Sequence, residues 1–403
     1  MTAAARPIRS GLGRGGLRRR ERVMAFDLPL LVCAVGLIAF GFIMVASASM
    51  ATAANCCDDP FYYVHRHAIA LSLAVLIGLV AYSVPVDWWE RGGVWLFLSG
   101  VLALLLVLIP GLGREVNGAT RWIPLGPLTF QPSEFVKLFA VIYVAGYLVR
   151  HADDVVNRIS GFIRPMILIG IAGALILQQP DFGTTAVMLA TVMGLLFLGG
   201  VSLMPFVLLF VVVGIGLLTL VMTSPYRLQR ITSFLDPFED PFGSGYQLTQ
   251  ALIAFGRGEW FGVGLGNGIQ KQFFLPEAHT DFLVSVVGEE FGLIGMLILI
   301  SVFAWITWRA FSIGARADAV GQRFAAYAAQ GIGLGLGLQA FVNIGVNVGL
   351  LPTKGLTLPF LSYGSNSLIA ACMALAILLK IDVTVRRLEA EQGPKRGLSW
   401  VRV

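Results

Sequence analysis

The sequence predicts an all-α, polytopic integral membrane protein with about ten transmembrane helices. The first observation is composition, because 57% of its 403 residues are hydrophobic and only 13% are charged, whereas soluble domains carry about 25% charged residues. The second is that the apolar residues fall in runs long enough to cross a bilayer. The third is an uneven distribution of Lys and Arg between the segments that join these runs. Together they exclude a soluble enzyme, a disulfide-rich secreted domain and a disordered chain.

Ten apolar runs, taken in chain order, give the expected helices. They lie near 27–50, 68–84, 93–110, 132–149, 165–179, 185–200, 205–223, 282–307, 325–350 and 367–383. Each approaches the roughly 20 residues that span the hydrocarbon core. Only the tight turn at Gln178–Asp181 separates the fifth run from the sixth. An even number of spans places both termini on the same side of the membrane.

The basic residues indicate which side that is. With both termini inside, the inner segments hold twenty Lys and Arg, the outer segments hold eight, and Lys137 lies within a span. Cytoplasmic segments of membrane proteins carry the excess of basic residues. We therefore expect cytoplasmic termini. The same rule accounts for the pI of 9.3, so we expect no nucleic-acid partner.

The chain is expected to form a basic cytoplasmic tail (1–26), a ten-helix region (27–383) and a cytoplasmic C-terminal tail (384–403). Arginines of the first tail should meet anionic lipid headgroups. The region 224–281, between the seventh and eighth spans, is one large extracytoplasmic loop. Nearly all of the unusual polar sequence lies in the outer segments, so we expect the protein's chemistry at the outer face.

Cys56 and Cys57 are adjacent in the chain. A bridge between neighbouring cysteines requires a strained ring. We therefore expect no disulfide between them.

Asp281 is the first candidate for chemistry, because it lies directly before the eighth span. Two roles are open. An Asp at a helix start accepts backbone N–H bonds as an N-cap, and the bare residues favour this role. Alternatively, its carboxylate is a base held at the outer membrane boundary, although hydrogen bonds from the helix terminus would lower its basicity. Asp181, before the sixth span, is expected to be an N-cap.

Glu289, Glu134 and Lys137 are charges within spans, where a charge is usually paired or functional. Glu289 lies on the face of Asp281, about 12 Å deeper at helical rise. Lys137 is a candidate partner for Glu289, but Glu134, three residues before Lys137, can satisfy it locally. For all three we expect a structural ion pair. Glu290 is assigned no role.

Several outer cations run against the positive-inside trend. They are Arg121, Arg227, Arg230, Lys271 and Lys354. Scattered, solvated surface charges are the first explanation. The alternative is a phosphate-bearing substrate at the outer leaflet, because cations stabilise a leaving phosphate.

Six motifs then occur in an order that resembles a known family. They are Arg114-Glu-Val-Asn-Gly-Ala-Thr-Arg-Trp122, Gln131-Pro-Ser-Glu134, Gln179-Pro-Asp-Phe-Gly-Thr-Thr185, Gly264-Leu-Gly-Asn-Gly268, Pro276-Glu-Ala-His-Thr-Asp281 and Leu358-Pro-Phe-Leu-Ser-Tyr-Gly364. Together they resemble the SEDS family (shape, elongation, division and sporulation) over nearly the whole chain. The first and fifth motifs are more similar to the family's cell-division member than to its elongation member.

The resemblance implies a peptidoglycan glycosyltransferase that polymerises lipid II at the outer face of the bacterial cytoplasmic (inner) membrane, at the division septum. It also implies partners: a class B penicillin-binding protein, which is the cognate transpeptidase, other divisome membrane proteins and membrane lipids. The family's proposed catalytic residue corresponds to Asp281, which reverses the preference for a cap.

One carboxylate base and a few cations suffice for this reaction. We expect Asp281 to be the base. The expected pyrophosphate or sugar contacts are Arg121, Trp122, Lys271, His279, Lys354 and Ser362. No metal-ligand cage is evident and no cofactor is required, but a divalent cation (Mg²⁺ or Mn²⁺) that shields the pyrophosphate stays open.

One departure from the family pattern is Ser365-Asn366-Ser367, where the family has Gly-Ser-Ser. If this turn needs a positive φ, Ser365 would be strained there. The contacts of this loop are therefore open.

Two other functions also stay open. A lipid II flippase needs polar surface through the whole bilayer, whereas the charges here cluster near its outer third. A non-catalytic scaffold or activator of the transpeptidase would use the long outer loop. Replacing Asp281 by Asn separates an enzyme from a scaffold.

Overall fold

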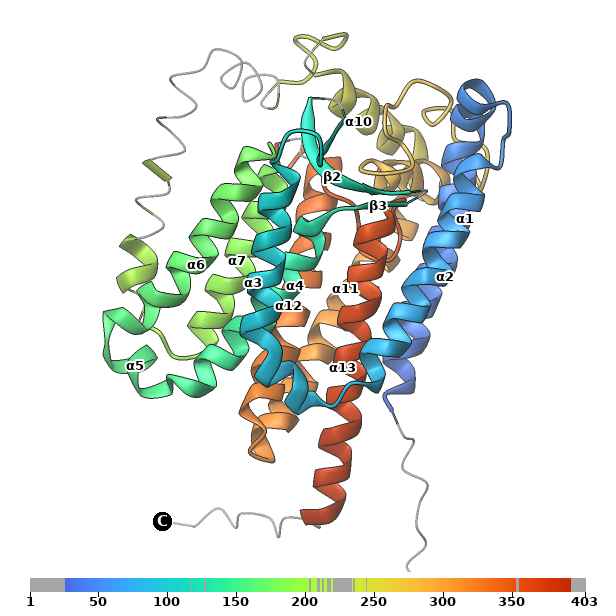
Figure 1. The fold of residues 1–403 in the computed structure, drawn as a ribbon. Helices are drawn as coiled ribbons and strands as arrows, with labels where there is room; N and C mark the ends of the chain where they lie inside the picture. Colours follow the sequence, from blue (N-terminus) through green and yellow to red (C-terminus); the bar gives the residue numbers. More distant parts are fainter. Residues whose placement is uncertain are drawn as a thin grey trace, which may run out of the picture.

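The computed structural model describes residues 26–116, 118–126, 128–202, 204–208, 236–243, 245–352 and 355–392, with isolated positions between 211 and 234. Figure 1 shows long helices side by side, with three short strands and α10 gathered at one end of the bundle. We call this the outer end. The described chain enters α1 and leaves α13 at the opposite, inner end (Figure 1).

The described chain confirms the all-α membrane fold. Eight helices in this part of the chain are long and apolar enough to cross a membrane. They are α1 (Leu28–Cys57), α2 (Tyr62–Ser83), α3 (Val86–Val107), α4 (Pro132–Arg150), α6 (Ile159–Gln178), α11 (Leu283–Ala319), α12 (Arg323–Asn347) and α13 (Ser365–Gln392). Three shorter helices are α5 (Ala152–Asn157), α7 (Phe182–Leu198) and α10 (Tyr246–Gly258).

The expected spans match these helices with two exceptions. The seventh run, 205–223, lies outside the residues that the structure describes continuously. α13 continues to Gln392, so the region beyond 383 that we expected to be a tail begins as helix. Val385 in this extension is buried, and buried contacts of this kind stabilise a helix beyond its apolar run.

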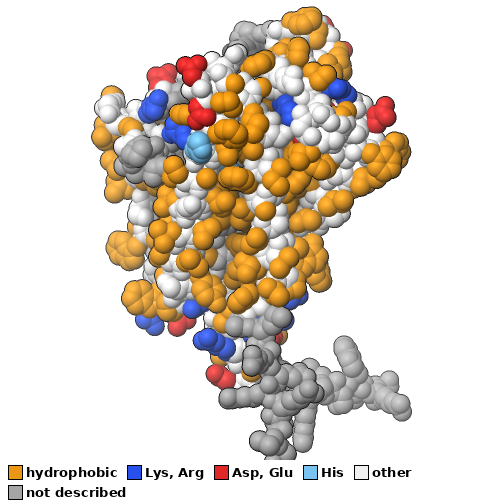
Figure 2. Space-filling model, turned by 90° about the vertical axis from the view of Figure 1, so that its right-hand side faces the viewer, with side chains coloured by type: hydrophobic (Ala, Val, Ile, Leu, Met, Phe, Trp, Pro, Cys, Tyr) orange, Lys and Arg blue, Asp and Glu red, His pale blue; other side chains and the backbone are white. Residues whose placement is uncertain are grey.

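The lateral surface of the bundle is that of a membrane protein. Figure 2 shows hydrophobic side chains spread over the side of the molecule, with Lys, Arg, Asp and Glu gathered towards its two ends. Leu76, Leu79 and Val80 of α2 are each about 60% exposed. Such apolar exposure is favourable only against lipid.

Three strands at the outer end were not predicted. β1 (Arg114–Val116), β2 (Ala119–Leu125) and β3 (Leu128–Phe130) form an antiparallel sheet in the order β1-β2-β3. Arg114 pairs with Trp122, and Ile123 pairs with Phe130. This sheet connects α3 to α4 and carries Arg121 and Trp122.

α11 is broken near its outer end. Gly292 has φ 65° and ψ −163°, which interrupts the helix. A Cβ at Gly292 would lie within 2.5 Å of the backbone nitrogen of Gly262, so only glycine allows the outer loop to pack here. The loop also donates from Val263 N to Glu289 O at 3.0 Å. The glycine-spaced run 262–268 therefore serves close backbone packing.

α12 lies at the centre of the bundle, against α11, α4 and α7. At the inner end, ion pairs connect α11 and α13 to each other and to Asp27, the N-cap of α1. Buried Asp27 pairs with Arg309 of α11, and buried Asp382 pairs with Arg386 and Arg316. Removing one partner of a buried pair is costly, so these pairs hold α1, α11 and α13 together.

The structure corrects one local expectation. Cys56 and Cys57 are joined as a disulfide at the end of α1. The helix ends there, and Asp58 has left-handed backbone geometry.

Candidate active site

A cavity of about 450 Å³ opens at the outer end of the bundle. We call it the outer cavity. Five parts of the chain that are distant in sequence meet around it. Its charged or polar lining includes Arg66 of α2, Arg121 of β2, Glu134 of α4, Glu277, Thr280 and Asp281 before α11, and Ser365, Asn366 and Ser367 of α13. Trp122 of β2 and Tyr363 add aromatic surface.

Asp281 does not cap α11. The N-cap of this helix is Phe282, which makes no side-chain cap hydrogen bond. The backbone carbonyl of Asp281 instead accepts hydrogen bonds from the side-chain amides of Asn343 (3.0 Å) and Asn347 (2.9 Å). Its carboxylate accepts none from any residue that the structure describes, and it lines the outer cavity. The N-cap interpretation of Asp281 is therefore wrong.

The surroundings of Asp281 favour its protonated form. Burial, and after it the negative charge of Glu277, raise the pKa of this carboxyl to about 7. Arg121 opposes this by lowering the pKa, while Asp181 and Glu134 add smaller increases. A carboxyl that titrates near neutrality can take up a proton during a reaction at physiological pH.

Arg121 faces the outer cavity from β2. Its Nε donates to Gln179 O at 2.9 Å and its Nη2 donates to Pro180 O at 2.6 Å. These bonds fix the planar guanidinium against the turn between α6 and α7. A fixed guanidinium beside a cavity binds phosphate oxygens well. The predicted residues Arg121 and Trp122 thus lie together with Asp281.

Arg66 is a second arginine of the outer cavity, and sequence analysis counted it only among the outer charges. Its Nη1 donates to the hydroxyl of Tyr62 at 2.6 Å, and the guanidinium lies over the ring of that tyrosine. Nothing in its local sequence marks it. Only the packing of α2 beside α13 brings it to this cavity.

Asp181 has the role that the sequence predicts. Its Oδ1 accepts from the backbone N–H of Thr184 at 3.2 Å, as the N-cap of α7. Its backbone carbonyl accepts from the hydroxyl of Thr185 at 2.9 Å. The side chain is only 3% exposed. Burial raises its pKa, while Arg121 and the Thr184 hydrogen bond lower it.

Lys271 is not brought to the outer cavity. It is buried, and its ammonium pairs with Glu290 and donates to the hydroxyl of Ser47 in α1 at 2.6 Å. The structure thus contradicts the expectation of a pyrophosphate contact. It also gives Glu290, to which no role was assigned, a partner. This pair ties the outer loop to α1 and α11.

Glu289 is structural as expected, but its partner is not Lys137. It pairs with Arg257 of α10 at 2.9 Å and also accepts from the backbone N–H of Ile269 at 2.8 Å. Lys137 belongs to the local alternative, since its Nζ lies 3.0 Å from Glu134. The packing of α10 against α11 brings Arg257 to Glu289.

His279 and Ser362 lie behind the wall of the outer cavity. His279 is buried, packs between the rings of Tyr63 and Tyr363, and its backbone carbonyl accepts from Tyr363 N. The hydroxyl of Ser362 accepts from Leu358 N at 3.0 Å within its own turn. Both support cavity residues and are not among those that line it. Lys354 lies outside the described residues.

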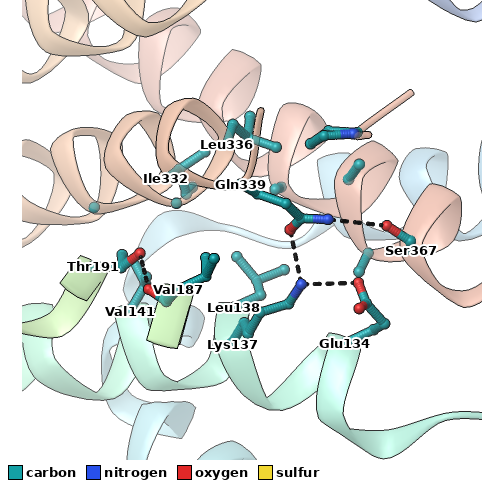
Figure 3. A pocket seen from close by; sticks show the side chains of 16 residues that line it. Glu134, Lys137, Leu138, Val141, Val187, Thr191, Ile332, Leu336, Gln339 and Ser367 are labelled. Atoms are coloured by element: carbon teal, nitrogen blue, oxygen red, sulfur yellow. Dashed lines mark hydrogen bonds and ion pairs between the residues drawn. The ribbon is translucent and has the colours of Figure 1, made fainter. Parts of the chain in front are cut away.

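A smaller pocket of about 60 Å³ lies deeper and shares Glu134 and Ser367 with the outer cavity. Figure 3 shows Lys137 between Glu134 and Gln339, and Gln339 extended towards Ser367. Lys137 donates to Gln339 Oε1 at 2.8 Å. The amide nitrogen of Gln339 donates to Thr357 O at 3.0 Å.

Ser365 is not strained. It is the first residue of α13, and it is not among the residues with positive φ. Asn366 donates to Thr129 O at 2.8 Å, which ties α13 to β3. The condition for strain, a positive φ at this position, is therefore not met.

No group of three or more His, Cys, Asp or Glu in the described part of the chain is arranged to hold a metal ion. Asp281 and Glu277 could each offer one carboxylate from the cavity wall. The phosphates of a ligand would have to supply further oxygens to a divalent ion.

Comparisons with known proteins agree on the family. A family model described as "Cell cycle protein", for FtsW, RodA and SpoVE, matches residues 28–387. A protein of Allochromatium vinosum named "Probable peptidoglycan glycosyltransferase FtsW" is 71% identical over 384 residues, 95% of this chain and 96% of that protein. A protein of the same name from Nitrosococcus halophilus is 51% identical, over 89% of this chain and 93% of its own.

Solved structures share the fold. One chain, from a structure described as "Structural coordination of polymerization and crosslinking by a peptidoglycan synthase complex", has TM-score 0.75 and 28% identity over 90% of this chain and 99% of its own. Thermus thermophilus RodA has TM-score 0.65 and 27% identity over 89% of this chain and 97% of its own.

Proposed function

The chain belongs to the cell cycle protein family of FtsW, RodA and SpoVE, and from this premise we propose that it is a peptidoglycan glycosyltransferase that polymerises lipid II during septal wall synthesis. It is a multi-pass protein of the bacterial inner membrane. The relatives that carry the FtsW name support the division role. The excess of basic residues in the inner segments supports a reaction at the outer face of the membrane.

The observation that carries the proposal is the carboxylate of Asp281. It faces a cavity, has no hydrogen-bond donor among the described residues and titrates at a pKa of about 7. A general base needs a free carboxylate whose pKa lies near the working pH. An N-cap carboxylate does not meet the first condition, because a backbone N–H occupies it.

The reaction follows from these groups. The 4-hydroxyl of the acceptor sugar loses its proton to Asp281 as its oxygen attacks the anomeric carbon of the donor. The bond from that carbon to the pyrophosphate oxygen breaks on the opposite face, so the configuration inverts. Undecaprenyl pyrophosphate leaves with the electron pair. Arg121 and Arg66, on the cavity wall, stabilise the charge that develops there.

The partner is proposed from the same family. A chain of similar fold occurs in a structure described as a peptidoglycan synthase complex. We propose that this protein works with a class B penicillin-binding protein that cross-links its product, together with other membrane proteins of the divisome. We propose the same topology that the basic residues indicate. The cytoplasm holds the two tails, 1–26 and 384–403, and the outer face holds the loop 224–281.

Polymer formation from purified lipid II tests the proposal. Wild type and Asp281→Asn are reconstituted with and without the transpeptidase, and penicillin is added to block cross-linking. We expect glycan from wild type and none from the variant, with the partner bound equally to both. Equal polymer from both would remove Asp281 from the mechanism. No polymer from either, with the transpeptidase bound, would favour a flippase or a scaffold.

A further inference from the structure

The position of Asp281 is set through its backbone. No residue in the described part of the chain donates a hydrogen bond to its carboxylate. Its carbonyl oxygen, in contrast, accepts two amide hydrogen bonds, from Asn343 at 3.0 Å and from Asn347 at 2.9 Å. Both asparagines are almost fully buried. Two bonds to one oxygen fix the residue better than one does.

The two asparagines also hold the neighbours of Asp281. Asn347 Oδ1 accepts from both the backbone N–H and the hydroxyl of Ser285, at 3.2 and 2.8 Å. This ties the start of α11 to α12. The amide of Asn343 donates to Leu356 O. That bond anchors the segment that includes Gly355, where an added Cβ would lie 3.1 Å from Asp281 Oδ2.

Gln339 continues this pattern one turn away. Gln339, Asn343 and Asn347 are spaced at i, i+4 and i+8 on α12, so their side chains share one face of the helix. Gln339 donates to Thr357 O, next to the carbonyl that Asn343 holds, and accepts from Lys137. Figure 3 shows how it joins Lys137 to Ser367. We call these three residues the amide ladder.

We propose that the amide ladder positions the base. Asn343 and Asn347 hold the backbone of Asp281. Gln339 holds Lys137, and with it the Glu134–Lys137 pair, relative to the same helix. This rests on the function proposed above for Asp281. Amides suit the task because each offers donors and an acceptor without a net charge. A charged residue at these positions would shift the equilibrium of the base that it positions.

The ladder lies on α12, which packs against α11, α4 and α7, and this gives the site a rigid reference. Groups built on a packed helix are held more closely than groups on loops. Asp281, Gly355 and Thr357 all lie in loop segments. The ladder thus transfers the rigidity of α12 to the loops that form the cavity wall.

The test compares Asn343→Ala, Asn347→Ala and the double variant with Gln330→Ala. Gln330 lies on the same helix but is not in the ladder, so it is the matched control. Each single variant leaves one amide on the Asp281 carbonyl, which protects the fold. Misplacement of a catalytic group by about 1 Å costs about 10²-fold in rate. We expect each single variant to lose about tenfold in kcat with KM unchanged, and the double variant to lose more.

A second measurement does not depend on activity. Hydrogen exchange of the peptide that covers 277–285 should be faster in the ladder variants and unchanged in the control, while exchange of α4 and α6 stays as in wild type. Unchanged kcat and unchanged exchange would overturn the proposal. So would equal losses in Gln330→Ala, or a rise in KM that accounts for the whole effect.

The proposed function and the ladder fail in different ways. If wild type makes no polymer, the function of Asp281 fails, and the exchange measurement still decides whether the ladder holds this segment. If wild type makes polymer and Asp281→Asn does not, yet the ladder variants match the control, the ladder alone fails.

Discussion

Asp181 and Asp281 occupy similar sequence contexts, but they differ in which of their atoms make hydrogen bonds. Each follows a polar motif, precedes a phenylalanine and stands before a helix. The carboxylate of Asp181 accepts from Thr184 N and caps α7. The carboxylate of Asp281 accepts nothing from the described residues and faces the outer cavity. In Asp281 the backbone carbonyl, not the side chain, makes the anchoring bonds.

This difference in hydrogen bonding shows how the fold can hold an aspartate in place without using its carboxylate. A side chain that caps a helix is occupied: the Thr184 hydrogen bond lowers the pKa of Asp181, although burial raises it more. At Asp281 the N-cap position belongs to Phe282, which offers no acceptor in its side chain. The amides of α12 replace the anchoring that a cap would give. The protein can therefore hold this residue in place and leave its carboxylate free.

The largest expected effect separates the two aspartates directly. Asp281→Asn should lower polymerisation by about 10³-fold, within the range of general-base contributions. Asp181→Asn should stay within about threefold of wild type, because Asn caps a helix as well as Asp does. Initial rates of polymer formation by both variants, in one liposome preparation, measure this. Similar losses in both would show that the two residues do not differ as described.

Arg121 should give the next largest effect. Arg121→Gln should lower kcat by about 10- to 100-fold, since one oriented stabilising group contributes about that much or somewhat more. Arg114→Gln is the matched control, because Arg114 lies on the same sheet but does not line the cavity. Equal kinetics of the two variants would remove Arg121 from the site. Steady-state rates at several lipid II concentrations provide the measurement.

Substitution of the two aspartates should change the thermal stability of the protein in opposite directions. The folded pKa of Asp281 is raised, so the folded state binds more protons than the unfolded state between about pH 4 and about pH 7, and stability falls as pH rises through that window. Asp281→Asn removes this effect and should raise Tm by a few degrees at about pH 8, but not near pH 4. Asp181→Ala should lower Tm, because losing a cap costs about 1 kcal/mol. Thermal unfolding in detergent measures both. A lower Tm for Asp281→Asn at high pH would contradict the account.

The smallest expected effect concerns Glu277. Its negative charge is the second cause that raises the pKa of Asp281. Glu277→Gln should therefore move the acidic limb of the rate profile to lower pH by a fraction of a unit, and less at high salt because Glu277 is exposed. Glu115→Gln on β1 is the control. A shift to higher pH in Glu277→Gln would have the wrong sign.

The sequence predicted the membrane fold, because apolar runs and basic residues respond to the bilayer itself. It predicted Asp181 as a cap and offered Glu134 as one of two partners for Lys137, since both contacts depend on neighbours in the chain. It misplaced Lys271 and the partner of Glu289, because the outer loop folds back onto α11 through close glycine contacts. Arg66 was missed since only helix packing brings it to the cavity. The helical spacing of the amides at 339, 343 and 347 can be read from the sequence, but the backbone carbonyls that they bind cannot.

The pH dependence of kcat/KM tests most directly whether the carboxyl of Asp281 ionises near neutrality as the essential base. Wild type and Asp181→Asn are compared from about pH 5 to about pH 9, because kcat/KM reports the essential groups of the free enzyme. We expect an acidic limb near pH 7 in wild type and a limb only slightly lower in Asp181→Asn. A limb near pH 4 in wild type, or its loss in Asp181→Asn, would contradict the account.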